Sequence, residues 1–268
     1  MATTLDAPEV VDPTATAMVW RAYLSFVDGF RRTWRGWVAT MFGIPVLNLL
    51  AFGYGLGHLI GQSNGDVEGV AYVAFLAPGL LAATAMNSAV EESTWAMFTA
   101  IKWQRTYHAM LATPLTARQV LISHLLWAGT RVAMSAAVLL ALIVGLGLAT
   151  PWAVLALPAA ILVGLAFAAP VMAFTAHMDS EANFAYLFRF GVMPLYLFSG
   201  TFFPISQLPQ WLEVIAWITP LWHGVALCRD LVLGHLQWLD FVHVGYLSAM
   251  LAVGLWLADK SFRRRMVV

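Results

Sequence analysis

Residues 69–89 read GVAYVAFLAPGLLAATAMNSA, an apolar stretch that contains no Asp, Glu, Lys or Arg. A helix that crosses the hydrocarbon core of a bilayer needs about 20 consecutive apolar residues, and this stretch is long enough. The rest of the chain has the same character, because 61% of its 268 residues are hydrophobic and only 10% are charged. A soluble domain carries about 25% charged residues. The sequence therefore predicts an all-α integral membrane protein.

Similar apolar stretches recur along the chain and predict six transmembrane helices. The predicted spans are residues 38–61, 70–94, 120–148, 153–176, 184–203 and 241–258. Basic residues indicate the orientation, because cytoplasmic segments of membrane proteins carry an excess of Lys and Arg. They gather at residues 31–35, 102–118 and 260–265, which predicts a multi-pass protein with both termini in the cytoplasm.

The two ends of the chain are predicted to lie outside this membrane domain of residues 20–258. Residues 1–19 hold acidic but no basic side chains and no apolar core, so they are expected to form a disordered cytoplasmic tail. Residues 259–268 are expected to form a basic cytoplasmic tail.

An amphipathic helix is predicted over residues 20–37, which read WRAYLSFVDGFRRTWRGW. Aromatic side chains, including Trp20 and Trp34, recur at helical spacing, while Arg31, Arg32 and Arg35 fall mainly on the other side. This pattern is typical of a helix that lies along the membrane surface. The alternative is that the segment is the polar start of the first span.

Residues 202–224, FFPISQLPQWLEVIAWITPLWHG, are apolar but interrupted by prolines that leave each helical piece too short to cross the bilayer. We expect residues 204–238 to form an external re-entrant helical hairpin, stabilised by protein or by a water-filled cavity. An amphipathic cap on the outer surface is the alternative. If the hairpin gates a path, the candidate gate residues are Phe202, Phe203, Pro204, Pro209, Trp211, Pro220, His223 and Arg229.

Four charged residues fall inside or near the ends of predicted spans: Glu91, Glu92, Arg131 and Arg189. Charges in the bilayer are costly and usually pair or face a cavity. We therefore expect one of the two glutamates to pair with one of the two arginines near the inner mouth. Arg189 has an alternative, which is to extend its side chain to the inner membrane surface.

Several chemistries have no pattern to support them. Cys228 is the only cysteine, the histidines show no His-Glu-x-x-His spacing, and no Gly-x-Ser-x-Gly elbow is present. The two lysines, Lys102 and Lys260, do not follow a glycine-rich loop, so the chain has no P-loop for ATP. No catalytic residue, metal site or cofactor is expected in this chain.

An ordered series of segments resembles the type-two ABC exporter permeases, in the branch of the nodulation-factor (lipo-oligosaccharide) and daunorubicin exporters. It comprises GYGLGHLIG (53–61), the stretch at 69–89, WQRTYHAMLATPLTARQVL (103–121) and SGTFFPISQLPQWLEVIAWITPLWHGVALCR (199–229). The resemblance implies a permease in the bacterial cytoplasmic (inner) membrane. It also implies two copies of a separate ABC ATPase, which would bind ATP and Mg, and a second permease, expected to be a copy of this chain.

The resemblance further implies a coupling helix, predicted over residues 98–113, that seats on the ATPase. The expected contact residues are Lys102, Arg105, Tyr107, Met110 and Leu111, because arginine and aromatic side chains are frequent interface anchors. The amphipathic helix at residues 20–37 would pack beside this coupling helix and pass on its movement.

The leading functional hypothesis is an exporter of an amphipathic cargo, either a lipid-linked oligosaccharide or a hydrophobic drug, with membrane lipid around it and no nucleic-acid partner. An alternative is a membrane-embedded glycolipid or acyl transferase, for which Glu91, Glu92 and His124 would be the starting residues. A channel would need rings of polar residues, which the predicted spans do not show.

Overall fold

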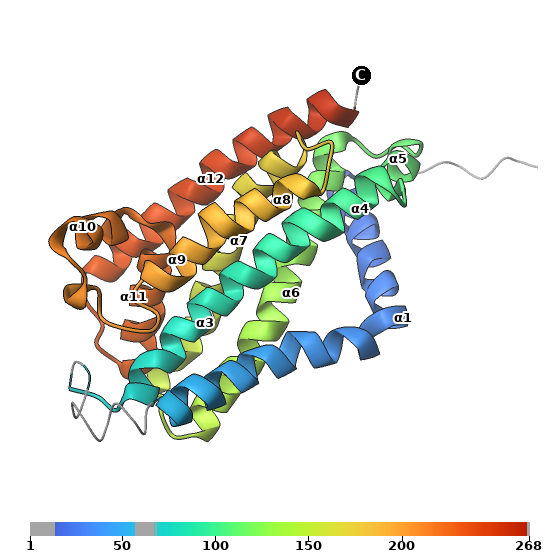
Figure 1. Cartoon of the computed structure of the whole chain (residues 1–268). Helices are drawn as coiled ribbons and strands as arrows, with labels where there is room; N and C mark the ends of the chain where they lie inside the picture. Colours follow the sequence, from blue (N-terminus) through green and yellow to red (C-terminus); the bar gives the residue numbers. More distant parts are fainter. Residues whose placement is uncertain (1–13, 57–66, 68, 267–268) are drawn as a thin grey trace, which may run out of the picture.

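The computed structural model describes residues 14–56, 67 and 69–266. Figure 1 shows an elongated bundle of helices, with the C-terminus and α5 at one end and α10 at the other. Within the described ranges the only extended pairing is one bridge between Val67 and Val70. The described chain is therefore helical, as the composition predicts.

The helical elements follow one another along the whole described chain. In order they are α1 (Ala15–Asn48), η1 (Leu49–Leu56), α3 (Tyr72–Glu91), η2 (Glu92–Ala96), α4 (Met97–Lys102), α5 (Thr106–Leu111), α6 (Ala117–Gly145), η3 (Pro151–Leu155), α7 (Ala156–Thr175), α8 (Ala182–Tyr186), η4 (Leu187–Val192), α9 (Met193–Phe198), η5 (Ile205–Gln207), α10 (Gln210–Ile218), α11 (Pro220–Leu233) and α12 (Leu239–Met266). Of the η elements, η1, η2 and η4 are π-helical, and η3 and η5 are 3₁₀ turns.

Four of the described helices are long and apolar enough to cross a membrane. They are Tyr72–Lys102, which joins α3, η2 and α4, Ala117–Gly145, Pro151–Thr175 and Leu239–Met266. These four correspond to the second, third, fourth and sixth predicted spans. Helices α10 and α11 pass the same criteria only as a pair bent by 81°. The described residues thus hold four or five candidate spans, where the sequence predicts six.

The two remaining predicted spans differ from this set for separate reasons. The fifth, residues 184–203, folds as the run α8, η4 and α9, which ends at Phe198 and is too short to count as a full span. The first, residues 38–61, corresponds to the second half of α1 together with η1, which reaches Leu56. Its last residues and most of the following loop lie outside the described residues.

Helix α1 differs from the predicted arrangement of a tail to residue 19, a surface helix and a separate first span. It begins at Ala15 and continues without interruption to Asn48, although Figure 1 shows it bending sharply between two arms. The only proline in α1 is Pro45, so no helix-breaking residue separates the arms. The two arms are therefore parts of one helix that changes direction, and the position of residues 20–37 along the membrane surface stays a prediction.

The basic C-terminal segment is largely helical. Helix α12 continues to Met266, past the predicted end of the sixth span at Ala258, and the cytoplasmic position of residues 259–268 stays a prediction. Asp259 and Arg263, one turn apart, pair at 3.0 Å, and three arginines occupy the last turn. Both features stabilise a helix end, because positive side chains interact favourably with the C-terminal end of the helix dipole.

Helix α7 lies inside the bundle and packs against α3, α6, α11 and α12. Glycines allow this close packing. A Cβ atom on Gly164 or Gly224 would come within 2.7 Å of a valine on the neighbouring helix, and one on Gly254 within 2.6 Å of Pro170. Small residues at such contacts are typical of membrane helix bundles, where close backbone approach supplies the packing energy.

The segment predicted as a hairpin folds as two helices that meet at Thr219 and Pro220. Thr219 is extended (φ −73°, ψ 135°), because a residue that precedes proline disfavours the helical conformation. Pro220 then begins α11, a position where its missing N–H is tolerated. Helix α11 ends at Leu233, and Gly234 after it is left-handed (φ 79°), as is common after a helix C-terminus.

Candidate functional site

Residues 98–113, predicted as one coupling helix, divide between two helices: α4, which ends the span Tyr72–Lys102, and the short helix α5 in the loop before Ala117–Gly145. The break occurs at Arg105, the only non-glycine residue with positive φ (52°) among the described residues. Helix α6 then begins with the capping box that Thr116 and Gln119 form, each side chain bonding the other's backbone N–H. The loop is thus held between two well-defined spans.

The predicted contact residues of this loop do not all face outward. Lys102 and Arg105 are exposed, and Trp103 beside them is 61% exposed. Met110 and Leu111 are half-buried against the core. Tyr107 is only 1% exposed, so its prediction as a contact with a partner protein was wrong. Of the predicted set, Lys102 and Arg105 are available to a partner.

Tyr107 points into the protein and joins four helices. Its hydroxyl lies 2.8 Å from Nδ1 of His124 on α6, and its ring packs edge-on against Phe26 of α1 and Phe262 of α12. Burial raises the pKa of Tyr107 well above its usual value, so the hydroxyl keeps its proton at neutral pH. The other ring nitrogen of His124 lies 3.3 Å from the backbone oxygen of Glu92.

A second cluster joins the ends of α4 and α12 to the turn after α7. The carboxylate of Asp179, in the turn after α7, lies 3.3 Å from Lys102 Nζ and 3.2 Å from Arg265 of α12. Arg265 also donates to the backbone oxygen of Ala176. The hydrogen bond from Lys102 and the charge of Arg265 lower the pKa of Asp179. Lys102 therefore has a structural partner in addition to its exposed position.

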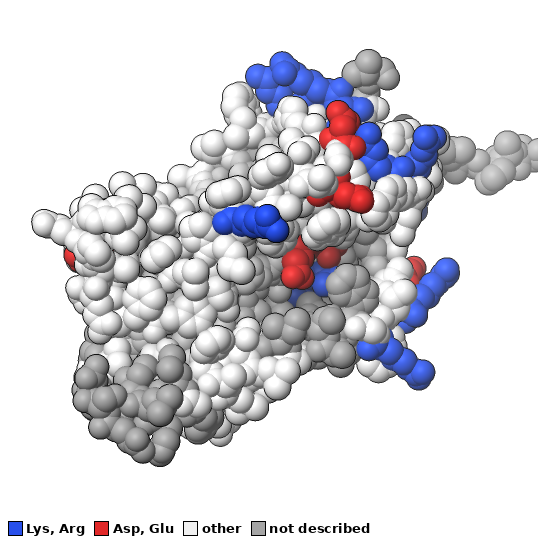
Figure 2. Space-filling model, viewed as in Figure 1, with Lys and Arg blue, Asp and Glu red and all other residues white. Residues whose placement is uncertain are grey.

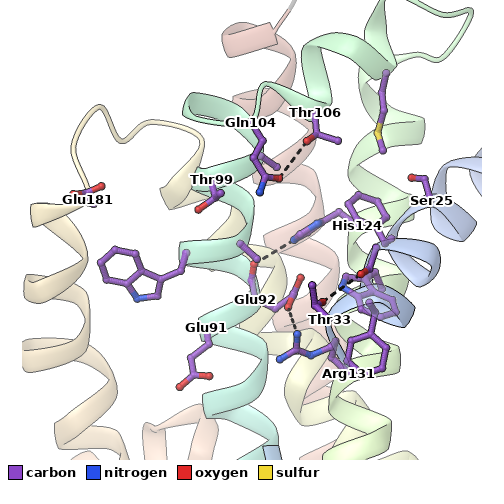
Figure 3. A pocket seen from close by; sticks show the side chains of 18 of the residues that line it. Ser25, Thr33, Glu91, Glu92, Thr99, Gln104, Thr106, His124, Arg131 and Glu181 are labelled. Carbon is purple, nitrogen blue, oxygen red and sulfur yellow. Dashed lines mark hydrogen bonds and ion pairs between the residues drawn. The ribbon is translucent and has the colours of Figure 1, made fainter. Parts of the chain in front are cut away.

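A cavity of about 1250 Å³ lies between the loop that contains α5, the first arm of α1 around Ser25 to Thr33, and the start of α8. Figure 3 shows residues from these elements converging on it. Its polar lining includes Ser25, Thr33, Glu91, Thr99, Gln104 and Glu181, and its aromatic lining includes Phe30, Trp95, Trp127 and Phe188. The cavity thus offers carboxylates and hydroxyls together with flat apolar surfaces.

The predicted ion pair inside the membrane domain is formed by Glu92 and Arg131, which lie 3.2 Å apart with both side chains buried. Figure 3 shows the two facing each other at the cavity, with Glu91 turned away from them. Glu91 is exposed and lines the cavity. Arg189 is exposed on η4, and the alternative that its side chain extends to the inner membrane surface stays a prediction.

The first arm of α1 covers the cavity from one side. Phe26 and Phe30 face inward, with Phe30 packed against Trp127 at 5.5 Å and Phe26 against His124 at 5.4 Å. Tyr23 is hydrogen-bonded to Thr130 at 3.1 Å. The predicted surface residues of this arm are all exposed: Trp20, Arg31, Arg32, Trp34 and Arg35. Two of its tryptophans thus share the outer face with the arginines.

The predicted gate residues lie toward the opposite end of the bundle from α5 (Figure 1) and separate into two groups. Exposed or half-buried are Phe202, Phe203, Pro209, Trp211, Pro220 and Arg229, and buried are Pro204 and His223. Arg229 stacks on Phe75 at 3.9 Å and donates to the backbone oxygen of Gly200 at 2.8 Å. It therefore fastens α11 to α3 and to the turn after α9.

His223 also has specific internal contacts. Its Nδ1 lies 2.7 Å from Nδ1 of His243 on α12, and the ring of Tyr246 stacks on it at 4.0 Å. Among the described residues, no group of three His, Cys, Asp or Glu could hold a metal ion. This histidine pair therefore joins α11 to α12.

The sequence analysis did not predict the contacts that His124 and Asp179 make. His124 lies two turns before Arg131 on the same face of α6, a spacing that could have indicated a shared contact with α3 and η2. Nothing in the sequence indicated that Asp179 would meet Lys102 and Arg265, because these three residues are distant along the chain.

The distribution of charge agrees with a membrane position. On the face shown in Figure 2, Lys and Arg gather mainly at the end that carries the C-terminus and α5, and most of the remaining visible surface is uncharged. An uncharged outer surface is what lipid requires, and a basic end is typical of the cytoplasmic side.

Comparison with known proteins places the chain in a family. Residues 16–233 match the family model described as ABC-2 type transporter. The chain is 34% identical over 253 residues to Nodulation protein J of Rhizobium leguminosarum bv. trifolii, which covers 91% of this chain and 95% of that protein.

Two further relatives extend the comparison. Nodulation protein J of Rhizobium meliloti (strain 1021) is 30% identical over 266 residues, 93% of this chain and 100% of that protein. The Inner membrane transport permease YadH of Escherichia coli (strain K12) is 29% identical over 93 residues, 35% of this chain and 36% of that protein. The chain therefore belongs to the membrane family of ABC-2 type transporters.

Proposed function

We propose that this chain is the permease of an ABC exporter that moves an amphipathic cargo outward across the bacterial inner membrane. Membership of the ABC-2 type transporter family supports a transport role. We further propose six spans with both termini cytoplasmic, in which the second arm of α1 with η1 and the run α8, η4 and α9 complete the set. The basic end seen in Figure 2 supports this orientation.

The cavity beside the coupling loop, which is the segment between the spans Tyr72–Lys102 and Ala117–Gly145, is the main observation behind this proposal. It is bounded by the loop, by α1 and by the buried Glu92–Arg131 pair, so movement of the loop would reshape it directly. Its aromatic side chains suit a sugar ring or a lipid chain, and Glu91 and Glu181 suit hydroxyl or ammonium donors. We therefore propose a glycolipid, a lipid-linked oligosaccharide or a hydrophobic drug as the cargo.

The energy for transport would come from a separate subunit. The chain has two lysines and neither stands in a P-loop, so we assign ATP and Mg to two copies of a partner ATPase. Arg105, Trp103 and Lys102 form the exposed surface that would meet it. A second copy of this chain would complete the permease, and the hairpin of α10 and α11 would gate its external side.

The alternative of a membrane-embedded transferase is not favoured by a specific contact. Glu92 is engaged by Arg131, and both ring nitrogens of His124 have partners in Tyr107 and the backbone of Glu92. Neither side chain is therefore positioned as a free general base.

The test is to co-express the chain with candidate ABC ATPases from the same genome and to measure ATP hydrolysis of the complex in lipid nanodiscs against glycolipids and hydrophobic antibiotics. One cargo class should stimulate hydrolysis, and Arg105→Glu should remove the stimulation because it reverses the charge at the exposed contact surface. Arg118→Glu, an exposed basic residue on the first turn of α6, is the matched control and should keep it. Conversion of a lipid substrate by the chain alone would refute the proposal.

A further inference from the structure

The coupling loop is connected to the cavity wall through a buried chain of contacts. It begins at Tyr107 of α5, whose hydroxyl lies 2.8 Å from His124 Nδ1. It continues from His124 Nε2 to the backbone oxygen of Glu92, 3.3 Å away. It ends at the Glu92 carboxylate, which pairs with Arg131 at 3.2 Å. All four residues are buried.

The hydrogen-bond directions in this chain are fixed by what each group can donate. The backbone oxygen of Glu92 can only accept, so His124 Nε2 carries a proton and donates it. Nδ1 of the neutral ring is then an acceptor, and the Tyr107 hydroxyl is the donor that fills it. Loss of the tyrosine hydroxyl would leave Nδ1 buried without this partner, and a buried unsatisfied group is costly.

The contact with Glu92 falls on the first residue of η2, a single π-helical turn within the span Tyr72–Lys102. Such turns are weak points of a helix and occur often at functional sites. Two neighbouring helices, α6 and α7, form hydrogen bonds with the backbone of η2. His124 of α6 bonds the Glu92 oxygen, which also accepts from the N–H of Met97, and Thr175 of α7 donates to the oxygen of Ser93 at 2.8 Å.

The same face of α6 contacts η2 twice. His124 holds the backbone of Glu92, and Arg131, two turns further along α6, holds its side chain. A shift of Tyr107 would therefore move the π-turn and the ion pair together. Glu92, Ala96, His124 and Arg131 all line the cavity, so the cavity would change shape with them.

We propose that Tyr107 and His124 are positioning residues that transmit movement of the coupling loop to the π-turn Glu92–Ala96 and so set the shape of the cargo cavity. This inference rests on the proposed function and adds to it the internal route of coupling. It gives Tyr107 a role that its burial allows, in place of contact with the ATPase.

The test uses Tyr107→Phe, which removes the hydroxyl and keeps the ring that packs against Phe26 and Phe262. The probe is Ala96→Cys in a Cys228→Ala background, because Ala96 belongs to the π-turn and lines the cavity. Maleimide labelling of position 96 is measured in the co-expressed complex with and without ATP, together with ATP hydrolysis and cargo export.

In the parent complex, ATP should change the labelling rate. With Tyr107→Phe we expect this change and the export per ATP to fall about two- to tenfold, the factor that one ordinary hydrogen bond gives, while basal hydrolysis stays. Tyr23→Phe is the matched control, since it also deletes a phenol hydroxyl bonded to α6 but does not reach η2. Tyr23→Phe should leave both the ATP-dependent change in labelling and the export per ATP unchanged.

A double variant separates transmission from simple packing. Tyr107→Phe with His124→Leu replaces both polar partners by apolar groups, which can be nearly neutral for stability. We expect the double variant to fold and still to be uncoupled, and it carries the test if Tyr107→Phe alone folds poorly. Recovery of export in the double variant would overturn the proposal.

The proposed exporter function and the proposed transmission through Tyr107 and His124 can fail separately. If the parent complex exports cargo but ATP does not alter labelling at position 96, the proposed relay from Tyr107 through His124 to the π-turn is wrong and the exporter function stands. If the complex neither hydrolyses ATP nor exports, the proposed function fails and the relay with it.

Discussion

At the scale of single residues, Arg105 combines exposure with an unusual backbone. Its φ of 52° places an arginine in the left-handed region, where a side chain meets steric hindrance that glycine avoids. The residue is exposed at the break between α4 and α5. A strained, exposed arginine in the loop proposed to meet the ATPase is better explained by contact with a partner than by folding stability.

Arg105→Gly separates these two contributions. We expect it to raise the free energy of unfolding by up to about 1 kcal/mol, because the left-handed conformation costs a non-glycine residue roughly 1–2 kcal/mol and the greater entropy of unfolded glycine offsets about 0.5–1 kcal/mol of that gain. We also expect it to weaken capture of the ATPase. Thermal unfolding and co-purification measure the two effects. Gln104→Gly, at a neighbouring position without positive φ, is the control and should not stabilise. A loss of stability in Arg105→Gly would contradict the conclusion that the backbone of Arg105 is strained.

The Glu92–Arg131 pair gives a second prediction at this scale. Both side chains are buried, so Glu92→Gln or Arg131→Met alone should destabilise the fold by about 3–5 kcal/mol, the usual effect of leaving one buried charge without its partner. The double change should recover much of that loss. Thermal unfolding in detergent measures it, with the exposed Glu91→Gln expected within about 0.5 kcal/mol of the parent. Additive losses in the double variant would show that the two residues do not act as a pair.

Single residues illustrate what the sequence can and cannot predict. That one of the two glutamates would meet a buried arginine followed from the cost of charge in lipid, but the choice of Glu92 and Arg131 depends on how η2 rotates the chain. Tyr107 was predicted to be a surface contact because aromatic residues are common at interfaces. A six-residue helix carries too little periodicity to show which side is buried.

At the scale of elements, helices α7 and α12 depend on close approach at one glycine. A Cβ atom on Gly254 would lie 2.6 Å from Pro170 Cδ and 2.8 Å from its backbone nitrogen. Backbone atoms cannot move aside as a flexible side chain does. The contact therefore requires a residue without a side chain.

Gly254→Ala should consequently destabilise the protein by about 1–3 kcal/mol, the range typical of overpacking. Gly245→Ala on the same helix is the matched control, because a Cβ there meets nothing within 4 Å. It should be neutral or stabilise slightly, since alanine is the better helix former. Equal effects of the two changes on thermal unfolding would disprove close packing at Gly254.

The cluster around Asp179 makes the adjoining ends of α4, α7 and α12 sensitive to pH. Because Lys102 and Arg265 lower its pKa below the ordinary value of 3.8, the carboxylate adds stability above that value and loses it as pH falls through the lowered one. Asp179→Asn should therefore be less stable than the parent at pH 7, with the difference closing below about pH 3.8. A difference that does not change with pH would contradict the role of the charge.

Elements were predicted unevenly from the sequence. The long apolar spans and the capping box at Thr116 followed from length and spacing. The continuity of α1, the π-turns and the extension of α12 did not, because these features depend on neighbouring helices and on arginines that cap a helix as readily as they form a tail.

At the scale of the whole molecule, orientation is the property that the function depends on. Accessibility of single cysteines tests it, in a background where the only cysteine, Cys228, is replaced by alanine. Glu181 and Ser206 are both exposed. A cysteine at position 181 should react with a membrane-impermeant maleimide only from the cytoplasmic side, and one at position 206 only from outside. Reaction of both from the same side would contradict the six-span topology.

The most direct test of the central claim is ATP-driven movement of a cargo by the permease and its ATPase. Inside-out vesicles that contain both subunits are given a fluorescent glycolipid or a hydrophobic antibiotic, and uptake into the lumen is followed with and without ATP. We predict uptake of one cargo class that requires ATP and is lost with an inactive ATPase. ATP hydrolysis with no movement of either class, or movement that does not need the ATPase, would contradict the account.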